Sequence, residues 1–350
     1  MRIALDATYS LGEYLSGVGV YCREILAGLA QAHPEAAFDF CYRPRRWLRS
    51  FATSLPSNCR RRLLHEPLAP RSAQVFHGLN QRLPAVRLRR TVTTFHDLFV
   101  LTGDYSSPEF RRRFQAQARH AAARSDLIVT VSEFTASQVH ELLGVERARL
   151  RVIHHGVRLP EEDPAAEEAA RRRENMVLSV GAIQRRKNIS GLLEAFQRLG
   201  PDWRLVLAGS LGFGAAEILA QIENSPARDR IQVLGYVPAS ELSNLYRRAR
   251  IFAFPSLDEG FGLPVLEAMA WGVPVVTSNR SALPEVAGQA ALLVDPRDSD
   301  ALAVALLALA TREQLRGELI ARGRQRAAAF TWEAAVARTW SVYEELLGNA

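Results

Sequence analysis

The stretch from 255 to 269 (PSLDEGFGLPVLEAM) carries two glutamates, Glu259 and Glu267, with seven residues between them. An apolar strand is expected to end before this stretch, and a helix with proline in its first turn is expected to follow its glycines. Gly260 and Gly262 let backbone N–H groups approach a ligand closely. The N-terminus of the helix suits a phosphate, and carboxylates accept paired hydrogen bonds from the vicinal hydroxyls of a ribose or hexose. This spacing predicts a site for a phosphate and a sugar.

Lys187 is the one lysine among 44 basic residues, so the other 43 are arginines. Lysine is a compact point charge and arginine a planar fork, so a site that needs the compact charge would keep its lysine. Lys187 ends the motif VGAIQRRK (180–187), which follows an apolar strand. A cation here would neutralise phosphates and help a phosphorylated group to leave. An ordinary surface charge is the alternative.

Two further signals lie in the first half of the chain. Gly17 and Gly19 follow the first expected strand in the motif SGVG, which indicates either a phosphate-facing loop or an ordinary tight turn. His96 ends an expected strand over 90–96, and ligands of open α/β sheets bind at the carboxyl ends of strands. A structural histidine is the alternative for His96.

Apolar strands alternate with amphipathic helices along the chain, as in doubly wound α/β domains. The first series of strands is expected at 1–7, 38–42, 75–77, 90–96 and 126–131, with helices at 19–31 and after the cap Ser132. A polar stretch over 158–175 is the best linker candidate. The second series is expected at 176–181, 204–208, 231–234, 251–255, 273–277 and 291–294, with helices at 264–271 and from 300 to the end, broken near 330–332.

Charge is concentrated in the first half of the chain. Residues 1–165 hold 23 arginines and 16 acidic residues, a net +7, whereas residues 166–350 hold 21 of each sign. The basic half suits an anionic membrane surface or a phosphorylated acceptor, or it is a solvated arginine-rich surface. The neutral second half, without a base-reading motif, argues against nucleic acid. Three cysteines at no metal-like spacing, and no apolar stretch of membrane length, favour a reducing cytoplasm.

The motifs together resemble the family 4 glycosyltransferases. The stretch 255–269 is similar to the EX7E signature of that family, and the runs VPVV (273–276) and LPEVAG (283–288) also match it. The resemblance covers nearly the whole chain and is densest over 176–296. It implies the GT-B fold, an α/β architecture of two Rossmann-like domains facing across a cleft. We expect an acceptor-binding domain at 1–165, a nucleotide-sugar domain at 170–328, and a C-terminal helix at 329–350 that crosses back to the first domain.

The resemblance also implies roles for the second-half residues. Glu267 would bind the ribose of the nucleotide, Glu259 the transferred sugar, and Lys187 the diphosphate. The N–H groups of Gly260, Phe261, Gly262 and Leu263 would contact sugar hydroxyls and phosphate, and the backbone around Tyr236 would meet the base. Many relatives carry an arginine directly after the first glycine of the lysine motif. This chain has Ala182 there, so Arg186, or with less support Arg185, would replace that second cation.

In the first half, the resemblance directs Gly17 and Gly19 toward the donor phosphates and His96 toward hydroxyls of the transferred sugar. Asp97 would orient His96 or contact the acceptor. The motif HHGV (154–157) is interpreted as a hinge-side turn. The sequence DSD at 298–300 looks like a metal-binding D-x-D, but it precedes a helix that an Asp can cap, so no metal and no cofactor are expected.

The resemblance implies a retaining hexosyltransferase whose catalytic residues are His96, Lys187 and Glu259. GDP-mannose is the first choice of donor and a UDP-sugar the second. A glycan or lipid-linked glycan in cell-surface polysaccharide synthesis is the expected acceptor, at the inner face of the cytoplasmic membrane. A nucleotide-sugar-binding protein without catalysis, and a basic membrane- or nucleic-acid-binding protein, are the alternatives from other classes.

Overall fold

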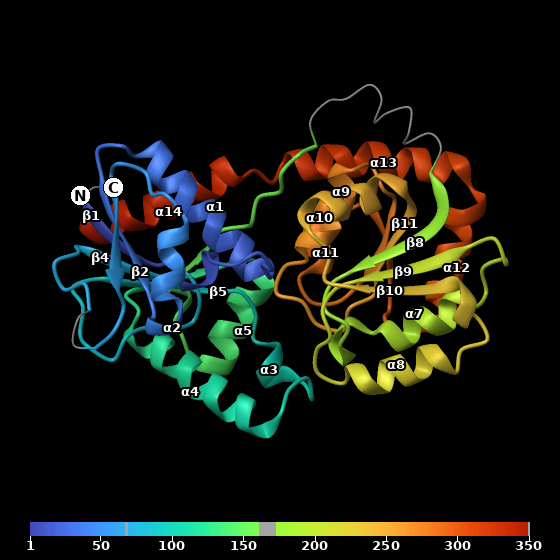
Figure 1. Cartoon of the computed structure of the whole chain (residues 1–350), viewed down its shortest axis with the longest axis horizontal. Coiled ribbons are helices and arrows are strands. Elements are labelled where there is room, and N and C mark those ends of the chain that lie inside the picture. The colour runs from blue at the N-terminus through green and yellow to red at the C-terminus, as the bar shows by residue number, and fades with distance from the viewer. Residues whose placement is uncertain (67–68, 161–172, 349–350) are drawn as a thin grey trace. The chain divides into compact units, whose positions relative to one another are not determined.

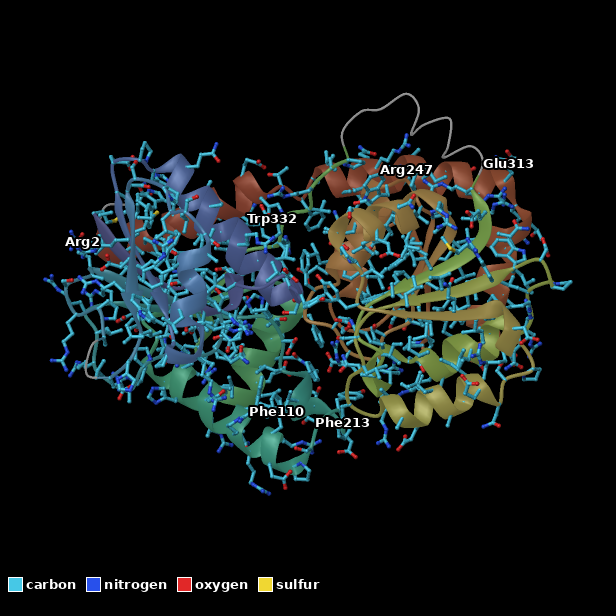
Figure 2. All side chains as sticks on the ribbon, viewed as in Figure 1. Arg2, Phe110, Phe213, Arg247, Glu313 and Trp332 are labelled. Carbon is cyan, nitrogen blue, oxygen red and sulfur yellow. The ribbon has the colours of Figure 1, made fainter. Side chains whose placement is uncertain are left out.

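The computed structural model describes residues 1–66, 69–160 and 173–348, and the chain forms two compact units (Figure 1). Unit 1 comprises Met1–Thr102, Ser107–Gly156 and Thr331–Ala350, and unit 2 comprises Gly103–Ser106 and Val157–Phe330. The division between the units falls at Gly156. The linker expected over 158–175 lies mostly outside the described residues, and β8 already begins at Glu174.

Unit 1 is built on a seven-stranded parallel sheet in the order β3-β2-β1-β4-β5-β6-β7. Its strands are β1 (Arg2–Asp6), β2 (Ala37–Tyr42), β3 (Cys59–Leu63), β4 (Val75–Gly78), β5 (Thr91–Phe95), β6 (Leu127–Thr130) and β7 (Leu150–Val152). The order reverses between β1 and β4, which makes this a doubly wound sheet. The five expected strands of this half are confirmed.

The two strands that sequence reasoning missed, β3 and β7, lie at opposite edges of the sheet. The β3 sequence CRRRL belongs to the basic first half, for which a solvated arginine-rich surface was one interpretation. Arg60 and Arg62 instead form ion pairs with Asp39, a fully buried residue of the adjacent strand β2. The carboxylate of Asp39 is thus compensated across the strand pair, which allows an arginine-rich strand to join the sheet.

The helices of unit 1 include its C-terminal helix, α14 (Trp332–Leu347), which packs against α1 (Gly17–Ala32). Gly28 permits this approach, because a Cβ there would lie 2.4 Å from Val336 Cγ2. The remaining helices are α2 (Pro44–Trp47), α3 (Phe99–Thr102), α4 (Pro108–Arg124) and α5 (Glu133–Leu143), with short 3-10 turns η1 (Thr8–Ser10), η2 (Leu48–Ala52) and η3 (Arg147–Arg149). Ser132 caps α5 as predicted, accepting a hydrogen bond from the Thr135 N–H at 3.0 Å.

Unit 2 is built on a six-stranded parallel sheet in the order β10-β9-β8-β11-β12-β13, the same winding as in unit 1. Its strands are β8 (Glu174–Val180), β9 (Arg204–Ala208), β10 (Ile231–Gly235), β11 (Ala249–Phe254), β12 (Val275–Ser278) and β13 (Ala291–Val294). All six lie where the sequence predicted them, to within two residues. The order reverses between β8 and β11, and the polar motifs of this half follow those two strands.

Helices cover both faces of the unit 2 sheet, with α7 and α8 on one face and α9, α10 and α13 on the other (Figure 1). They are α7 (Ile189–Phe196), α8 (Ala215–Glu223), α9 (Ala239–Arg248), α10 (Leu263–Ala270), α11 (Leu283–Ala287), α12 (Ser299–Thr311) and α13 (Glu313–Ala328), with 3-10 turns η4 (Arg185–Lys187) and η5 (Arg228–Arg230). The break expected near 330–332 is confirmed. A second break, at Arg312, was not foreseen in the apolar tail.

Candidate active site

Two sequence signals 72 residues apart meet at the switch point of the unit 2 sheet. Lys187 lies in the loop after β8 and Glu259 in the loop after β11, and the Lys187 Nζ lies 2.5 Å from Glu259 Oε1. Arg186 Nη1 lies 2.8 Å from the other carboxylate oxygen, Oε2. The three side chains are each at most 12% exposed. We call Arg186, Lys187 and Glu259 the charge cluster.

Lys187 is placed by a glycine and an aromatic ring. The turn η4 ends at Lys187, and Asn188 then adopts a left-handed conformation (φ 53°) that starts α7. Gly181 (φ 144°) makes room, since a Cβ there would lie 3.2 Å from Lys187 Cε. The Nζ also lies 4.4 Å from the centre of the Phe254 ring, a cation–π contact at the end of β11. These contacts fit the slender lysine side chain more closely than an arginine fork.

The charge cluster keeps Glu259 ionised. Burial alone would raise the pKa of this carboxyl, but Arg186 and Lys187 outweigh burial and lower the pKa to about 2. Two cations against one carboxylate leave the cluster with a net positive charge. Such a cluster can receive an anionic diphosphate while the carboxylate accepts hydrogen bonds from sugar hydroxyls.

The glycine turn after Glu259 is held by the segment that follows β12. The Ser281 hydroxyl accepts a hydrogen bond from the Glu259 N–H at 3.1 Å, and the Glu259 carbonyl accepts one from the Ala282 N–H at 3.2 Å. Gly262 (φ 108°) precedes α10, and a Cβ there would lie 2.6 Å from Leu283 Cδ2. Only glycine fits that position without strain, which explains the glycine before α10.

Glu267 lies on α10, and its carboxylate accepts a hydrogen bond from the Tyr246 hydroxyl of α9 at 2.8 Å. Burial raises the pKa of Glu267, although the Tyr246 hydrogen bond opposes that shift. Tyr246 is fully buried and was not singled out in the sequence. Its contact orients a carboxylate that remains partly exposed and can accept hydroxyl donors.

Arg173 is a second residue that sequence reasoning missed. Its guanidinium donates hydrogen bonds to the carbonyls of Tyr246, Ala249 and Trp271, each at 2.7 Å. It therefore joins the ends of α9 and α10 to the start of β11 and fixes the helix that carries Glu267. No sequence signal separates Arg173 from its arginine neighbours, because its partners are backbone atoms distant in the chain.

The remaining second-half candidates divide between the site and the surface. Arg186 faces the charge cluster, whereas Arg185 is 43% exposed and pairs with Glu217 of α8 at 2.6 Å. Of the two, Arg186 is thus placed as the second cation. Tyr236 follows the end of β10 and is 37% exposed. Phe261 is buried, and its ring lies edge-on to the Phe330 ring with centroids 6.0 Å apart. Its side chain therefore packs in the interior of unit 2.

His96 in unit 1 lies one residue beyond β5 and is buried. Its Nε2 donates a hydrogen bond to the Leu79 carbonyl at 2.9 Å, and its ring lies edge-on to Tyr21 with centroids 4.8 Å apart. Burial lowers the pKa of His96 to about 4, against the effect of the Leu79 hydrogen bond. His96 is therefore neutral at pH 7 with the proton on Nε2, and Nδ1 is a hydrogen-bond acceptor suited to a sugar hydroxyl.

The expected glycine loop is wrong in one respect, because Gly17 and Gly19 form the first turn of α1. Ser16 caps this helix by accepting a hydrogen bond from the Gly19 N–H at 3.4 Å. A Cβ on Gly19 would lie 2.9 Å from Leu15 Cδ2, whereas a Cβ on Gly17 would meet open space. Gly19 is thus a packing residue, and the SGVG motif forms a helix N-terminus rather than a loop.

A buried polar network lies next to His96 and includes Tyr21, whose ring contacts the His96 ring. His77 of β4 is hydrogen-bonded through Nδ1 to the Tyr343 hydroxyl of α14 at 2.7 Å and through Nε2 to Thr94 at 2.9 Å. Thr94 is also hydrogen-bonded to the Tyr21 hydroxyl at 2.9 Å. No sequence motif connects these residues. His155, predicted in a hinge-side turn, packs its buried ring against Tyr21 at 4.9 Å.

The D-x-D segment has a structural role, as predicted. Asp298 caps α12 by accepting a hydrogen bond from the Ala301 N–H at 2.8 Å, and Asp300 pairs with Arg198. Across the described ranges 1–66, 69–160 and 173–348, no group of three His, Cys, Asp or Glu side chains is arranged to hold a metal ion. In the same ranges, no helix is both long and apolar enough to cross a membrane.

Comparisons with known proteins bear on the family and the fold of the chain. The family described as Glycosyltransferase Family 4 matches residues 15–160, and that described as Glycosyl transferases group 1 matches residues 161–326. The chain is 37% identical over 284 residues to O-antigen chain mannosyltransferase B of Escherichia coli, covering 78% of this chain and 74% of that protein. It is 30% identical over 262 residues to the serotype-specific mannosyltransferase WbdA of Escherichia coli, 69% of this chain but 32% of that longer protein.

The fold is also that of a solved glycosyltransferase structure. Sucrose-phosphate synthase from Thermosynechococcus elongatus superposes with a TM-score of 0.82, covers the whole of both chains and is 23% identical. The chain belongs to the family 4 glycosyltransferases and is a glycosyltransferase enzyme with the GT-B fold.

Proposed function

We propose that this glycosyltransferase transfers a mannosyl residue, with retention of configuration, from GDP-mannose to a glycan or lipid-linked glycan acceptor. The observation that carries the proposal is the charge cluster at the unit 2 switch point, where Lys187 and Arg186 flank the ionised Glu259. The similarity to the two mannosyltransferases described above supports mannose as the transferred sugar. A UDP-sugar is the second choice of donor.

The chemistry follows from the residues of the cluster. The bond between the sugar C1 and the diphosphate oxygen breaks, and a bond from C1 to the acceptor oxygen forms on the same face. The departing diphosphate takes the acceptor's hydroxyl proton. Lys187 and Arg186 balance the charge that develops on the diphosphate, so the proposed reaction requires no metal.

The carboxylates and His96 are proposed to hold hydroxyls rather than to transfer protons. Glu267, oriented by Tyr246, accepts from the ribose of the nucleotide, and Glu259 accepts from the transferred sugar. The turn from Gly260 to Leu263 presents N–H groups to the sugar and phosphate. His96 is a poor general base because its pKa is near 4, and its Nδ1 accepts a hydrogen bond from a sugar hydroxyl.

Calorimetric titration of the purified protein with GDP and with UDP tests the nucleotide site. We expect GDP to bind more tightly than UDP. The affinity for GDP should fall about tenfold or more in Glu267→Ala, because the ribose hydroxyl pair loses its acceptor. Glu241→Ala, an exposed glutamate on α9, is the matched control and should bind GDP as the native protein does. Tighter binding of UDP would replace GDP-mannose by a UDP-sugar as the proposed donor. Binding of neither nucleotide would overturn the proposed nucleotide site in unit 2.

Retention is tested on the transferred product. The anomeric configuration of the new glycosidic bond, read by NMR, should equal that of the donor. An inverted product would refute the proposed mechanism while leaving the nucleotide site intact.

A further inference from the structure

The segment Pro44–Ala52, comprising α2 and η2 of unit 1, projects apolar side chains from the surface. Leu48 is 83% exposed, the most exposed large apolar side chain in the part of the chain that the structure describes, and Phe51 is 59% exposed. Trp47 lies partly buried behind them, packed on the unit 1 core and edge-on to Phe51 with ring centroids 5.2 Å apart. Trp47 therefore anchors a segment whose other apolar groups face water.

The same segment lies in the most one-sided charge distribution of the sequence. Residues 40–65 contain no Asp or Glu and seven arginines, namely Arg43, Arg45, Arg46, Arg49, Arg60, Arg61 and Arg62. Three of these compensate buried carboxylates, since Arg43 pairs with Asp6 and both Arg60 and Arg62 pair with Asp39.

Among the other arginines, Arg45 and Arg49 belong to the same segment as Leu48 and Phe51. Arg45 and Arg49 are exposed, and no described carboxylate lies within ion-pair distance of either. The Arg61 guanidinium lies 5.1 Å from the centre of the Phe51 ring while donating to the Ser50 carbonyl at 3.0 Å. The surface segment thus combines two exposed apolar side chains, Leu48 and Phe51, with two exposed arginines that no described carboxylate compensates.

We propose that the segment Pro44–Ala52 docks unit 1 onto an anionic lipid bilayer. Leu48 and Phe51 enter the boundary between headgroups and acyl chains, and Arg45 and Arg49 bind lipid phosphates, a combination that suits interfacial binding. A nucleic acid would satisfy the arginines but would leave Leu48 and Phe51 in water. The proposal is independent of the transfer reaction, because docking needs neither donor nor acceptor.

The test is co-sedimentation of the full-length protein with vesicles of phosphatidylcholine containing about 30 mol% phosphatidylglycerol, compared with pure phosphatidylcholine, at low salt. Arg45→Gln with Arg49→Gln should weaken binding to the anionic vesicles about 25-fold, at roughly fivefold for each arginine. Leu48→Ser with Phe51→Ser should weaken it about tenfold or more, because both side chains lose apolar area in the lipid.

Matched controls come from unit 2. Val304→Ser removes an apolar side chain that is 67% exposed on α12, and Arg322→Gln removes an exposed charge on α13. Both controls should bind vesicles as the native protein does, and the serine and glutamine variants should keep the native melting temperature because the substituted groups are exposed. Quenching of Trp47 by brominated lipid, lost in Trp47→Phe, should place this segment at the membrane.

Three results would overturn the proposal. The first is equal binding to anionic and neutral vesicles, and the second is unchanged binding after loss of Leu48 and Phe51. The third is tighter binding to double-stranded DNA than to vesicles, with DNA binding unchanged in the Leu48→Ser, Phe51→Ser variant. That result would assign the surface to nucleic acid. GDP binding should be the same in all variants, so failure here leaves the donor site standing.

Discussion

The substitution Glu259→Gln tests whether Arg186 and Lys187 stabilise the ionised carboxylate of Glu259, as their ion pairs indicate. The pKa of Glu259 falls from 4.5 to about 2 in the folded protein, because Arg186 and Lys187 outweigh the effect of burial. A shift of about 2.5 units at about 1.4 kcal/mol per unit corresponds to about 3 kcal/mol of stability. The group is 7% exposed, so solvent screening does not reduce this figure much.

The sign of the pH dependence follows from the lowered pKa. A carboxyl with a depressed folded-state pKa contributes its full stability above the unfolded-state pKa of 4.5 and loses it as pH falls through the folded value near 2. Glu259→Gln is uncharged at every pH and resembles the protonated native side chain. The free energy of unfolding of the native protein should therefore exceed that of the variant by about 3 kcal/mol at pH 7 and by about half of that at pH 3.

The assay is urea unfolding of native and variant protein at pH 7, 5, 4 and 3, with the free energy of unfolding compared at each pH. Glu241→Gln, an exposed and isosteric change on α9, is the control and should shift the free energy by less than about 0.5 kcal/mol. A difference between native and Glu259→Gln below about 1 kcal/mol at pH 7, or one that stays constant to pH 3, would refute the ion-pair account.

Two further predictions concern other parts of the site. Lys187→Met should lower kcat by about 100- to 1000-fold. Lys187→Arg should recover little of the lost kcat, because Gly181 and Phe254 leave room for the lysine side chain. Steady-state turnover measures kcat of both variants, and full activity of Lys187→Arg would contradict this fit. His77→Phe should destabilise unit 1 by about 2 kcal/mol, because Tyr343 loses its His77 partner and Thr94 loses one of its two partners, with GDP affinity unchanged. A native melting temperature would count against the network.

The strands of unit 2 and the two motifs after β8 and β11 were predictable because their signals are local. The six strands of unit 2 are short apolar runs, and the loops after β8 and β11 carry motifs that a parallel sheet necessarily brings to one edge. The rarity of lysine identified Lys187, and the structure places it against Glu259, one of the two glutamates of the other motif. The assigned roles of these residues remain predictions.

The features that were missed depend on contacts between distant residues. Arg173 binds carbonyls of Tyr246, Ala249 and Trp271, which carry no side-chain signal. The strand Cys59–Leu63 is apolar in only two of its five residues, and Asp39 of β2 pairs with two of its three arginines, Arg60 and Arg62. The Gly17 loop was misassigned because capping by Ser16 starts the helix two residues earlier than the apolar periodicity indicated.

The most direct test of the central claim is donor hydrolysis by the purified protein. Incubated with GDP-mannose and no acceptor, the native protein should slowly release GDP and mannose, whereas Lys187→Met and Glu267→Ala should release neither above background. The control Glu241→Ala should match the native rate. Failure of the native protein to turn over GDP-mannose or any UDP-sugar, or undiminished turnover by Lys187→Met, would contradict the assignment of the unit 2 cluster as the donor site.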